Sequence, residues 1–200
     1  MLENKLGITN SAELAREEER ISKTKASVMF ESGFLDTLEA GTVSTLCEIH
    51  RFLFCDIYDF AGKLRTVNIS KGKFRFASVM YLEYALAAVE KMPQSSFDEI
   101  IEKYVEMNIA HPFREGNGRS MRIWLDLMLK ASLGKVTDWN NVDKESYLAA
   151  MEHSPVSDRD IKAVIASALT DRISDRDTFM KGIDNSYYYE GYTAYSTARL

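Results

Sequence analysis

The stretch at residues 111–122 decides the fold, and it reads HPFREGNGRSMR. Apolar residues recur at helical spacing on both sides of it. They are Phe97, Ile100, Ile101, Tyr104 and Val105 before the stretch, and Met121, Trp124, Leu125, Met128 and Leu129 after it. Residues at positions i, i+3, i+4 and i+7 share one face of a helix. The pattern therefore predicts two helices joined by a tight loop.

The backbone of this loop is suited to bind an anion. Gly116 and Gly118 can adopt positive φ without a Cβ clash, and Asn117 tolerates the left-handed region better than most residues. Successive N–H groups can then point inward as a nest. The next helix is expected to begin near Gly118 or Arg119, so that its unpaired first amides and positive dipole end face the same loop. We therefore predict a phosphate site made of backbone.

Three charged side chains extend this phosphate site. Arg119 and Arg122 are three residues apart on the predicted helix, so both guanidinium groups are expected to reach one anion. A triphosphate carries enough charge to engage both. Glu115 would be repelled by phosphate unless a cation lay between them, and Mg²⁺ is commonly held by a carboxylate together with phosphate oxygens. Glu115 is therefore predicted to be a Mg²⁺ ligand.

His111 is the predicted general base. Pro112 favours extended geometry at His111 and ends the preceding helix at the mouth of the phosphate site. The ordinary pKa of histidine is about 6.5, so a neutral imidazole there can accept a proton from a hydroxyl that attacks phosphorus. Phosphoryl and nucleotidyl transfer depend mostly on positioning and charge neutralisation, and no covalent nucleophile is required.

Each of these features also has an ordinary structural interpretation. A histidine beside a proline can be a surface or capping residue, and a Gly-Asn-Gly sequence can be a simple turn. Arg122 can form a helical ion pair with Asp126. The fixed order of base, carboxylate, glycine loop and arginines between two helices favours the phosphate site over these alternatives.

The same stretch resembles, position for position, the motif H-x-F-x-[DE]-G-N-G-R-x-x-R of Fic proteins. Residues 60–72 are similar to the family's lead-in to its flap hairpin, so the resemblance spans much of residues 40–135. It implies an all-α Fic fold, a helical bundle with one small β-hairpin as a flap. It also implies transfer of AMP from ATP to a Ser, Thr or Tyr hydroxyl of a target protein, with Mg²⁺ bound and pyrophosphate released.

The resemblance assigns a role to each matching position. His111 would be the base, Phe113 a core anchor and Glu115 the Mg²⁺ ligand. The nucleotide-binding positions would be Gly116, Asn117 and Gly118 along the phosphates, Arg119 at the β-phosphate region and Arg122 at the γ-phosphate.

Residues 186–191 read SYYYEG and are similar to the inhibitory motif [ST]-x-x-x-E-[GN] of this family, with Ser186 and Glu190 at its defined positions. The resemblance implies a class III Fic protein that is inhibited in cis by a C-terminal helix over residues 184–192. Glu190 is expected to pair with Arg122 and so to engage the guanidinium that the γ-phosphate needs. In some relatives this glutamate also supports removal of AMP, and the sequence leaves that activity open.

The residues themselves suggest how this C-terminal helix begins and ends. Asp184 or Asn185 can cap its start, and Gly191 can end it at the C′ position. The alternative to inhibition is a tyrosine-rich helix that only packs on the body of the protein. The tyrosines among residues 187–195 offer hydroxyls for self-modification, although packing is the favoured interpretation of these side chains.

One β-hairpin is predicted between residues 65 and 76. Apolar residues alternate at positions 67 and 69 and again at 74 and 76, with a turn at residues 70–73 between them. An isolated hairpin is marginal in water, so its neighbours should hold it and leave an edge free for a peptide strand. The resemblance makes it the flap that aligns a target hydroxyl, with contacts at Lys71, Gly72 and Lys73. The alternative is an ordinary hairpin whose lysines discourage aggregation.

The remaining helices are predicted from apolar spacing and capping signals. Their expected ranges are residues 10–30, 42–58, 78–92, 96–110, 119–132, 143–153 and 157–170. With 200 residues and 46% hydrophobic content, the chain can bury one sizeable core, and no Pro/Gly/Ser linker divides it. We therefore expect a single domain over residues 1–200.

The composition of the chain disfavours several classes of protein and several kinds of binding site. The formal net charge of -5 disfavours a broad nucleic-acid surface. No hydrophobic run has signal or membrane-spanning length, so a cytoplasmic protein without membrane attachment is expected. Cys47 and Cys55 should be reduced core residues, and the three histidines show no zinc-ligand spacing. Self-association into a homo-oligomer is left open by the sequence.

Two other functions stay open at this point. One is transfer of a different phosphate-bearing moiety, such as UMP, phosphocholine or a phosphoryl group, although Doc-type relatives depart from the Gly-Asn-Gly loop. The other is a non-catalytic ATP-binding sensor, which the presence of His111 disfavours because binding alone needs no base. A P-loop is excluded because no Gly-Lys pair is followed by Ser or Thr.

Overall fold

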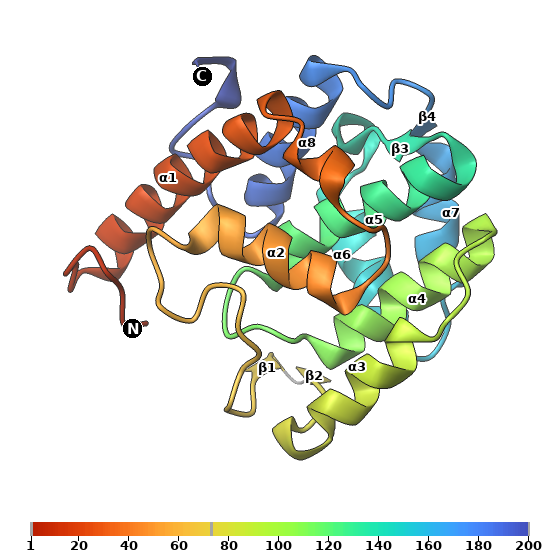
Figure 1. Cartoon of the computed structure of the whole chain (residues 1–200), viewed down its shortest axis with the longest axis horizontal. Coiled ribbons are helices and arrows are strands. Elements are labelled where there is room, and N and C mark those ends of the chain that lie inside the picture. Colours follow the sequence, from red (N-terminus) through yellow and green to blue (C-terminus); the bar gives the residue numbers. More distant parts are fainter. Residues whose placement is uncertain (1, 73, 200) are drawn as a thin grey trace.

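The computed structural model describes residues 2–72 and 74–199, which form a mostly helical chain with two very short β-sheets (Figure 1). The α-helices of the described residues are α1 (Ser11–Glu31), α2 (Val43–Phe54), α3 (Leu82–Glu90), α4 (Phe97–Ala110), α5 (Asn117–Leu133), α6 (Lys144–His153), α7 (Arg159–Ser167) and α8 (Arg176–Tyr189). The 3-10 helices are η1 (Phe34–Thr37), η2 (Val79–Tyr81), η3 (Trp139–Asn141) and η4 (Thr197–Arg199). The predicted all-α class is confirmed.

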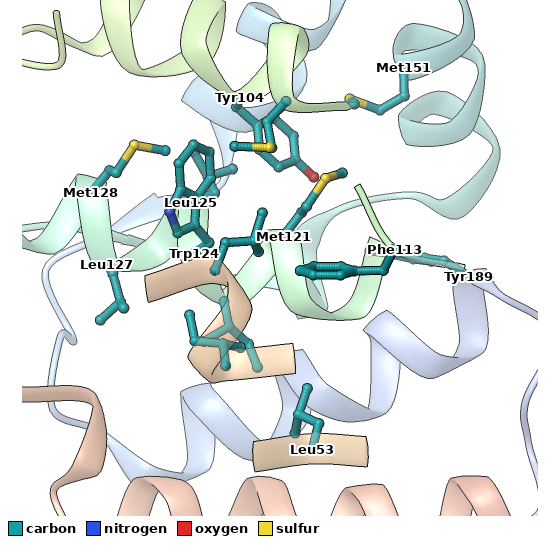
Figure 2. Packing of buried hydrophobic residues seen from close by; sticks show 14 of the residues in the cluster. Leu53, Tyr104, Phe113, Met121, Trp124, Leu125, Leu127, Met128, Met151 and Tyr189 are labelled. Carbon is teal, nitrogen blue, oxygen red and sulfur yellow. The ribbon is translucent and has the colours of Figure 1, made fainter. Parts of the chain in front are cut away.

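The core is built around α5, which packs against both α4 and α2. Trp124 of α5 and Tyr104 of α4 are fully buried, and Figure 2 places Met121 and Leu125 beside them. The indole N–H of Trp124 donates to the carbonyl of Thr42 over 2.9 Å, so the one polar atom of this side chain is satisfied. This bond holds the start of α2 against α5. The two helices that flank the loop at residues 111–116 therefore both contribute to the centre of the core.

Capping residues set several helix ends as the sequence suggests. Asn10 caps α1 by accepting hydrogen bonds from the amides of Ala12 and Glu13. Ser96 and Glu99 form a reciprocal capping box at the start of α4. Because α4 leads directly into the 111–122 loop, this box helps to fix the approach of the chain to that loop.

Three predicted helix ranges are wrong at their ends. The second helix stops at Phe54 rather than near residue 58, because Ile57 and Tyr58 reach the core from a turn. The range 78–92 begins as η2 and becomes α-helical only from Leu82. The range 157–170 ends at Ser167, because Leu169 and the residue after it pair as a strand. In each case a tertiary contact replaces the last or first helical turn.

The predicted hairpin is present but shorter than expected. Its strands are β1 (Ser70–Lys71) and β2 (Phe74–Arg75), which pair antiparallel, so residues predicted as the turn belong partly to a strand. The alternating residues before Ser70 form no strand, because Arg65 donates to the carbonyl of Val67 and the Asn68 side chain accepts from Val79. Lys73, one of the predicted flap contacts, lies outside the described residues. Figure 1 shows this hairpin at the lower edge of the molecule, beside α3.

A second antiparallel pair, β3 (Val136–Thr137) with β4 (Leu169–Thr170), was not predicted. Strands of two residues are too short to show an alternating pattern, so the sequence carried no signal for them. Together they tie the chain after α5 to the chain before α8.

The C-terminal helix is longer than the predicted range of 184–192. It begins at Arg176, where the side chain of Asp175 accepts a hydrogen bond from the amide of Thr178. Asp184 is therefore not its cap and instead accepts hydrogen bonds from Thr197. Gly191 follows the helix with φ of 92°, as its predicted role at C′ requires. Within the described residues, none of the helices has the length and apolarity needed to cross a membrane.

Candidate functional site

The loop at residues 111–116 is held in an unusual backbone conformation. His111 caps α4 in the left-handed region with φ of 48°, which is uncommon for a residue with a side chain. The buried Arg65 stabilises this turn because its Nε donates to the carbonyl of His111 over 2.8 Å. The same guanidinium also donates to the carbonyls of Val67, Ala77 and Ala110. Arg65 thus joins the flap segment to the end of α4.

The imidazole of His111 is arranged as a neutral proton acceptor. Its ring stacks on Phe76 with centroids 3.6 Å apart, and its Nδ1 lies 3.1 Å from the carbonyl of Asn108. A carbonyl can only accept, so we assign the ring proton to Nδ1, which leaves the Nε2 lone pair available. Burial lowers the pKa of His111 to about 4, so the ring is uncharged at neutral pH.

Asn117 gives the loop its shape through two hydrogen bonds to one residue. Its side chain accepts from the amide of Phe113 over 2.8 Å and donates to the carbonyl of Phe113 over 2.7 Å. The Asn117 side chain is therefore buried inside the loop, which leaves its backbone amide as the group that could contact phosphate. Phe113 is fully buried, as its predicted role as a core anchor requires.

His50 of α2 supports the loop through its ring, and no pattern in the sequence indicated this role. Its ring stacks on Phe113 with centroids 3.9 Å apart. Its Nδ1 accepts from the amide of Gly62, so its Nε2 carries the proton and donates to the carbonyl of Glu115 over 2.8 Å. Burial lowers the pKa of His50 to about 4, which keeps this ring neutral.

Only part of the predicted backbone nest is formed. Gly116 has positive φ, whereas Gly118 lies within the first turn of α5 and is helical. The amides of Asn117, Gly118 and Arg119 make no hydrogen bond to any described residue, as expected for the start of a helix. A Cβ on Gly118 would approach the Glu190 carboxylate to 2.5 Å. The anion site is therefore mainly a helix N-terminus, next to which Glu190 lies.

The structure contradicts the prediction that the guanidinium groups of Arg119 and Arg122 reach one anion. Arg119 is 1% exposed and forms ion pairs with Glu18 of α1 and, over 2.9 Å, with Glu115. Its guanidinium also lies over the ring of Tyr192 at 4.9 Å. Burial would raise the pKa of Glu18, but the charge of Arg119 holds that pKa below its ordinary value. Arg119 thus stabilises the buried side of the loop, because α1 supplies the carboxylate that pairs with its guanidinium.

Arg122 points instead toward the C-terminal helix. Its Nε donates to the hydroxyl of Ser186 over 2.7 Å, and a terminal nitrogen donates to the Ser186 carbonyl over 2.9 Å. That nitrogen lies 3.1 Å from the carboxylate of Glu190, so the expected pair of Glu190 with Arg122 is present. We call the contact among Arg122, Ser186 and Glu190 the α8 latch. The alternative pair with Asp126 is not formed, because Asp126 accepts from Thr137 and Trp139.

Glu190 is the electrostatic centre of the α8 latch. Its other carboxylate oxygen lies 3.3 Å from Nζ of Lys71 in β1. Burial would raise the pKa of Glu190, but Arg122 and Lys71 outweigh burial and lower it to about 2. Glu190 therefore stays charged at all physiological pH values and connects the flap hairpin with α5.

Glu115 is the one loop carboxylate with access to solvent. Its side chain is 42% exposed, and one of its oxygens accepts from the amide of Gly116 and from Arg119. The described residues hold no group of three or more His, Cys, Asp or Glu that could bind a metal by themselves. A single accessible carboxylate next to free amides fits Mg²⁺ that takes its other ligands from phosphate and water.

Comparison with known proteins agrees with this geometry. A model of the Fic/DOC family matches residues 40–129, which run from the segment before α2 to near the end of α5. The chain contains a Fic/DOC domain. Its relatives include the probable protein adenylyltransferase Fic of Salmonella typhimurium, which is 27% identical over an alignment of 187 positions that covers 86% of this chain and 88% of the relative. Protein adenylyltransferase VbhT of Bartonella schoenbuchensis is 31% identical over an alignment of 182 positions that covers 84% of this chain and 37% of that protein.

Solved structures support the fold of this Fic/DOC domain. The BepC protein of Bartonella tribocorum, with bound AMPPNP, superposes with a TM-score of 0.70 at 18% identity, covering 85% of this chain and 92% of that one. The N-terminal Fic domain of an effector from Bartonella sp. AR 15-3 gives a TM-score of 0.72 at 18% identity, covering 85% and 88%. At this level of identity the likeness establishes the Fic fold.

Proposed function

We propose that this protein transfers AMP from ATP to a hydroxyl group of a target protein and releases pyrophosphate. Relatives that match most of the chain carry the name of protein adenylyltransferase. The observation that carries the proposal is the neutral His111, whose unprotonated Nε2 belongs to the same loop as the free amides of α5. A base next to an anion site is what attack of a hydroxyl on a phosphorus atom requires.

The residues of the site divide the reaction among them. The target hydroxyl gives its proton to Nε2 of His111 while its oxygen forms a bond to the α-phosphorus. The bond from that phosphorus to the oxygen bridging to the β-phosphate breaks, and pyrophosphate leaves. The amides at the start of α5 bind phosphate oxygens, and Glu115 would hold Mg²⁺, which neutralises charge on the leaving group. Arg122 would bind the γ-phosphate once Ser186 and Glu190 release it.

We further propose that the α8 latch inhibits this reaction in cis, as in class III Fic proteins. The Glu190 carboxylate lies against Gly118 and takes the guanidinium of Arg122, so it competes with the terminal phosphate for both position and charge. Two hydrogen bonds from Arg122 to Ser186 hold the guanidinium toward α8. Because Glu190 remains ionised at neutral pH, acid within the physiological range would not release it.

The flap hairpin would present the target to His111. Phe76, which follows β2, stacks on the His111 ring, so a strand that pairs with the hairpin would lie near the base. Among the tyrosines of the C-terminal helix, Tyr188 is 47% exposed, whereas Tyr187 and Tyr189 are buried. Tyr188 is therefore the side chain of this helix most accessible to self-modification.

The test is transfer from ATP labelled either at the α-phosphate or at the γ-phosphate. We expect label on protein from the α position only, and no label from His111→Ala, which should still bind nucleotide because its amides are intact. Label from the γ position alone would identify a phosphoryl transferase. Nucleotide binding without transfer, in wild type and in Glu190→Gly, would identify a sensor instead.

A further inference from the structure

A cavity of about 280 Å³ lies between α5 and α8, away from the free amides of the loop. Its apolar walls come from the end of α1, from η1 and from both helices, through Phe30, Leu35, Ile123, Leu127, Phe179 and Ile183. Arg122 and Ser186 of the α8 latch also line it. The cavity is therefore in direct contact with the residues that we propose to control nucleotide binding.

Asp126 is a carboxylate of this cavity that lacks a cationic partner among the described residues. Asp126 of α5 lines the cavity, and its two oxygens accept from the amide of Thr137 and the indole N–H of Trp139, each over 2.8 Å. Among the described residues, no Lys, Arg or His nitrogen lies within 4.0 Å of its carboxylate. Burial raises the pKa of Asp126 to about 6, which reflects this missing counter-charge.

The other charged groups of the cavity are engaged elsewhere. Lys130 pairs with Asp36 over 2.6 Å, and Arg172 pairs with Asp138 over 2.5 Å. Arg122 pairs with Glu190 in the α8 latch. The remaining acidic group, Asp175, caps α8 and accepts from the amide and hydroxyl of Thr178. When each ion pair is counted as neutral, the cavity carries two carboxylates, Asp126 and Asp175, and no free cation among the residues described.

We propose that this cavity binds a small organic amine, with its ammonium group at Asp126 and its apolar body between α5 and α8. The volume lies just below the usual range of small-molecule sites, about 300–1,000 Å³, and a lining that is more apolar than polar, with a few polar side chains, is typical of them. An unpaired carboxylate in a partly buried site favours a cation over a neutral or anionic ligand. The site depends on the cavity and its charges, and it does not require the proposed function.

The regulatory consequence does rest on the proposed function. A ligand in the cavity contacts α5 and α8 together, in the arrangement where Ser186 holds Arg122. A ligand that binds one arrangement preferentially stabilises that arrangement, and by linkage it weakens any ligand that needs the other. Filling the cavity should therefore strengthen the α8 latch and lower AMP transfer.

Binding of phenethylamine to the full chain is measured in two ways, by saturation-transfer NMR and by the change in the temperature of thermal unfolding. The neutral 2-phenylethanol and the anionic phenylacetate keep the ring and replace the ammonium group by an uncharged or a negatively charged group. We expect phenethylamine to bind and to raise the Tm. The affinity for phenylacetate should be lower by about tenfold or more, the factor that corresponds to a modest charge preference. Asp126→Asn should remove this preference.

A matched pair of tryptophan variants locates the ligand. Leu35→Trp places a large side chain in the cavity wall, whereas Val156→Trp adds the same side chain at a position that is 84% exposed and does not line it. Phenethylamine should bind Val156→Trp as it binds wild type and should not bind Leu35→Trp. In the Asp126→Asn variant the new amide faces two hydrogen-bond donors, which can lower the stability of the protein. Leu35→Trp leaves position 126 unchanged, so it tests the site independently of that variant. Equal binding of amine and phenylacetate, unchanged binding to Leu35→Trp, or no binding at millimolar concentration would overturn the site.

The consequence for activity is measured separately. Saturating phenethylamine should lower transfer of α-label at least about fivefold, the lower end of typical allosteric coupling. It should have little effect on Leu35→Trp. If the amine binds and transfer is unchanged, the coupling is refuted while the site stands. If wild type and Glu190→Gly transfer no label, the proposed function fails while the binding measurement still decides the site.

Discussion

Arg119 and Arg122 lie three residues apart on α5, yet they serve two different regions of the molecule. Arg119 is enclosed by Glu18 of α1, by Glu115 and by aromatic rings, and it is 1% exposed. Arg122 is also buried and lies over the rings of Tyr147 and Tyr189, but its carboxylate partner, Glu190, comes from the end of α8 and has a side chain that is 23% exposed. One arginine pairs with a carboxylate buried in α1, and the other pairs with a partly exposed carboxylate at the end of the C-terminal helix.

This contrast teaches that identical residue types in one motif can be divided between stability and regulation. The carboxylate that neutralises Arg119 comes from the middle of a long helix and cannot leave without unfolding the packing of α1. The carboxylate that neutralises Arg122 lies at the C-cap of α8, followed by Gly191. We expect that a displacement of the last turn of α8, which carries Ser186 and leads into Glu190, would free Arg122 and leave Arg119 in place.

The largest expected effect is on stability. Arg119→Ala leaves Glu18 buried without its counter-charge, which should lower the free energy of unfolding by about 3–5 kcal/mol. Arg122→Ala should cost clearly less, because Glu190 can turn toward water. Urea unfolding of both variants measures the difference. Equal losses would contradict the division between a fixed and a releasable arginine.

The second prediction concerns His50, which supports the loop, and is tested through the pH dependence of stability. His50 has a folded pKa of about 4, below the ordinary value, so the unfolded state binds its proton more readily as the pH falls below about 6.5. Stability should therefore fall between pH 6.5 and pH 4, and His50 alone should account for about 2.5 kcal/mol at pH 4.5. Urea unfolding at several pH values measures the slope, and His50→Asn should reduce it.

The third prediction concerns the contact between Glu190 and Arg122. Glu190→Gly should raise transfer of α-label by roughly tenfold, within the usual range of coupling between sites, because Arg122 becomes available to phosphate. In an Arg122→Ala background the same substitution should have little effect. A gain of similar size in both backgrounds would show that Glu190 acts through another group. Glu145→Gly, at an exposed position of α6, is the matched control for loss of a glutamate.

The smallest effect is expected at the flap. Lys71 pairs with Glu190, but its side chain is 67% exposed, and such pairs contribute only about 0–1 kcal/mol. Lys71→Ala should therefore raise transfer about twofold at low ionic strength, and added salt should abolish the difference from wild type. A large gain from this substitution would indicate that the flap, rather than Arg122, holds Glu190 in place.

Much of the fold followed from short-range signals. The helices on both sides of residues 111–122 show strong apolar periodicity and are present, and Asn10, Ser96 and Gly191 act at helix ends as predicted. The errors include the two-residue strands, the start of the C-terminal helix, and the helix ends where a tertiary contact replaces a turn, such as Ser167. Such contacts join residues far apart in the chain, and no local pattern records them.

The sequence by itself determined the order of base, carboxylate, glycine loop and arginines, because the motif is local and its spacing sets which residues share a turn. Only the tertiary structure decided how these groups are used. It brought His50, Arg65 and Glu18 to the loop from other elements, turned Asn117 inward, and gave Arg119 and Arg122 different partners. The physical reason is that a side chain pairs with the charge nearest in space, and the packing of α1 and α8 on α5 sets which charge that is.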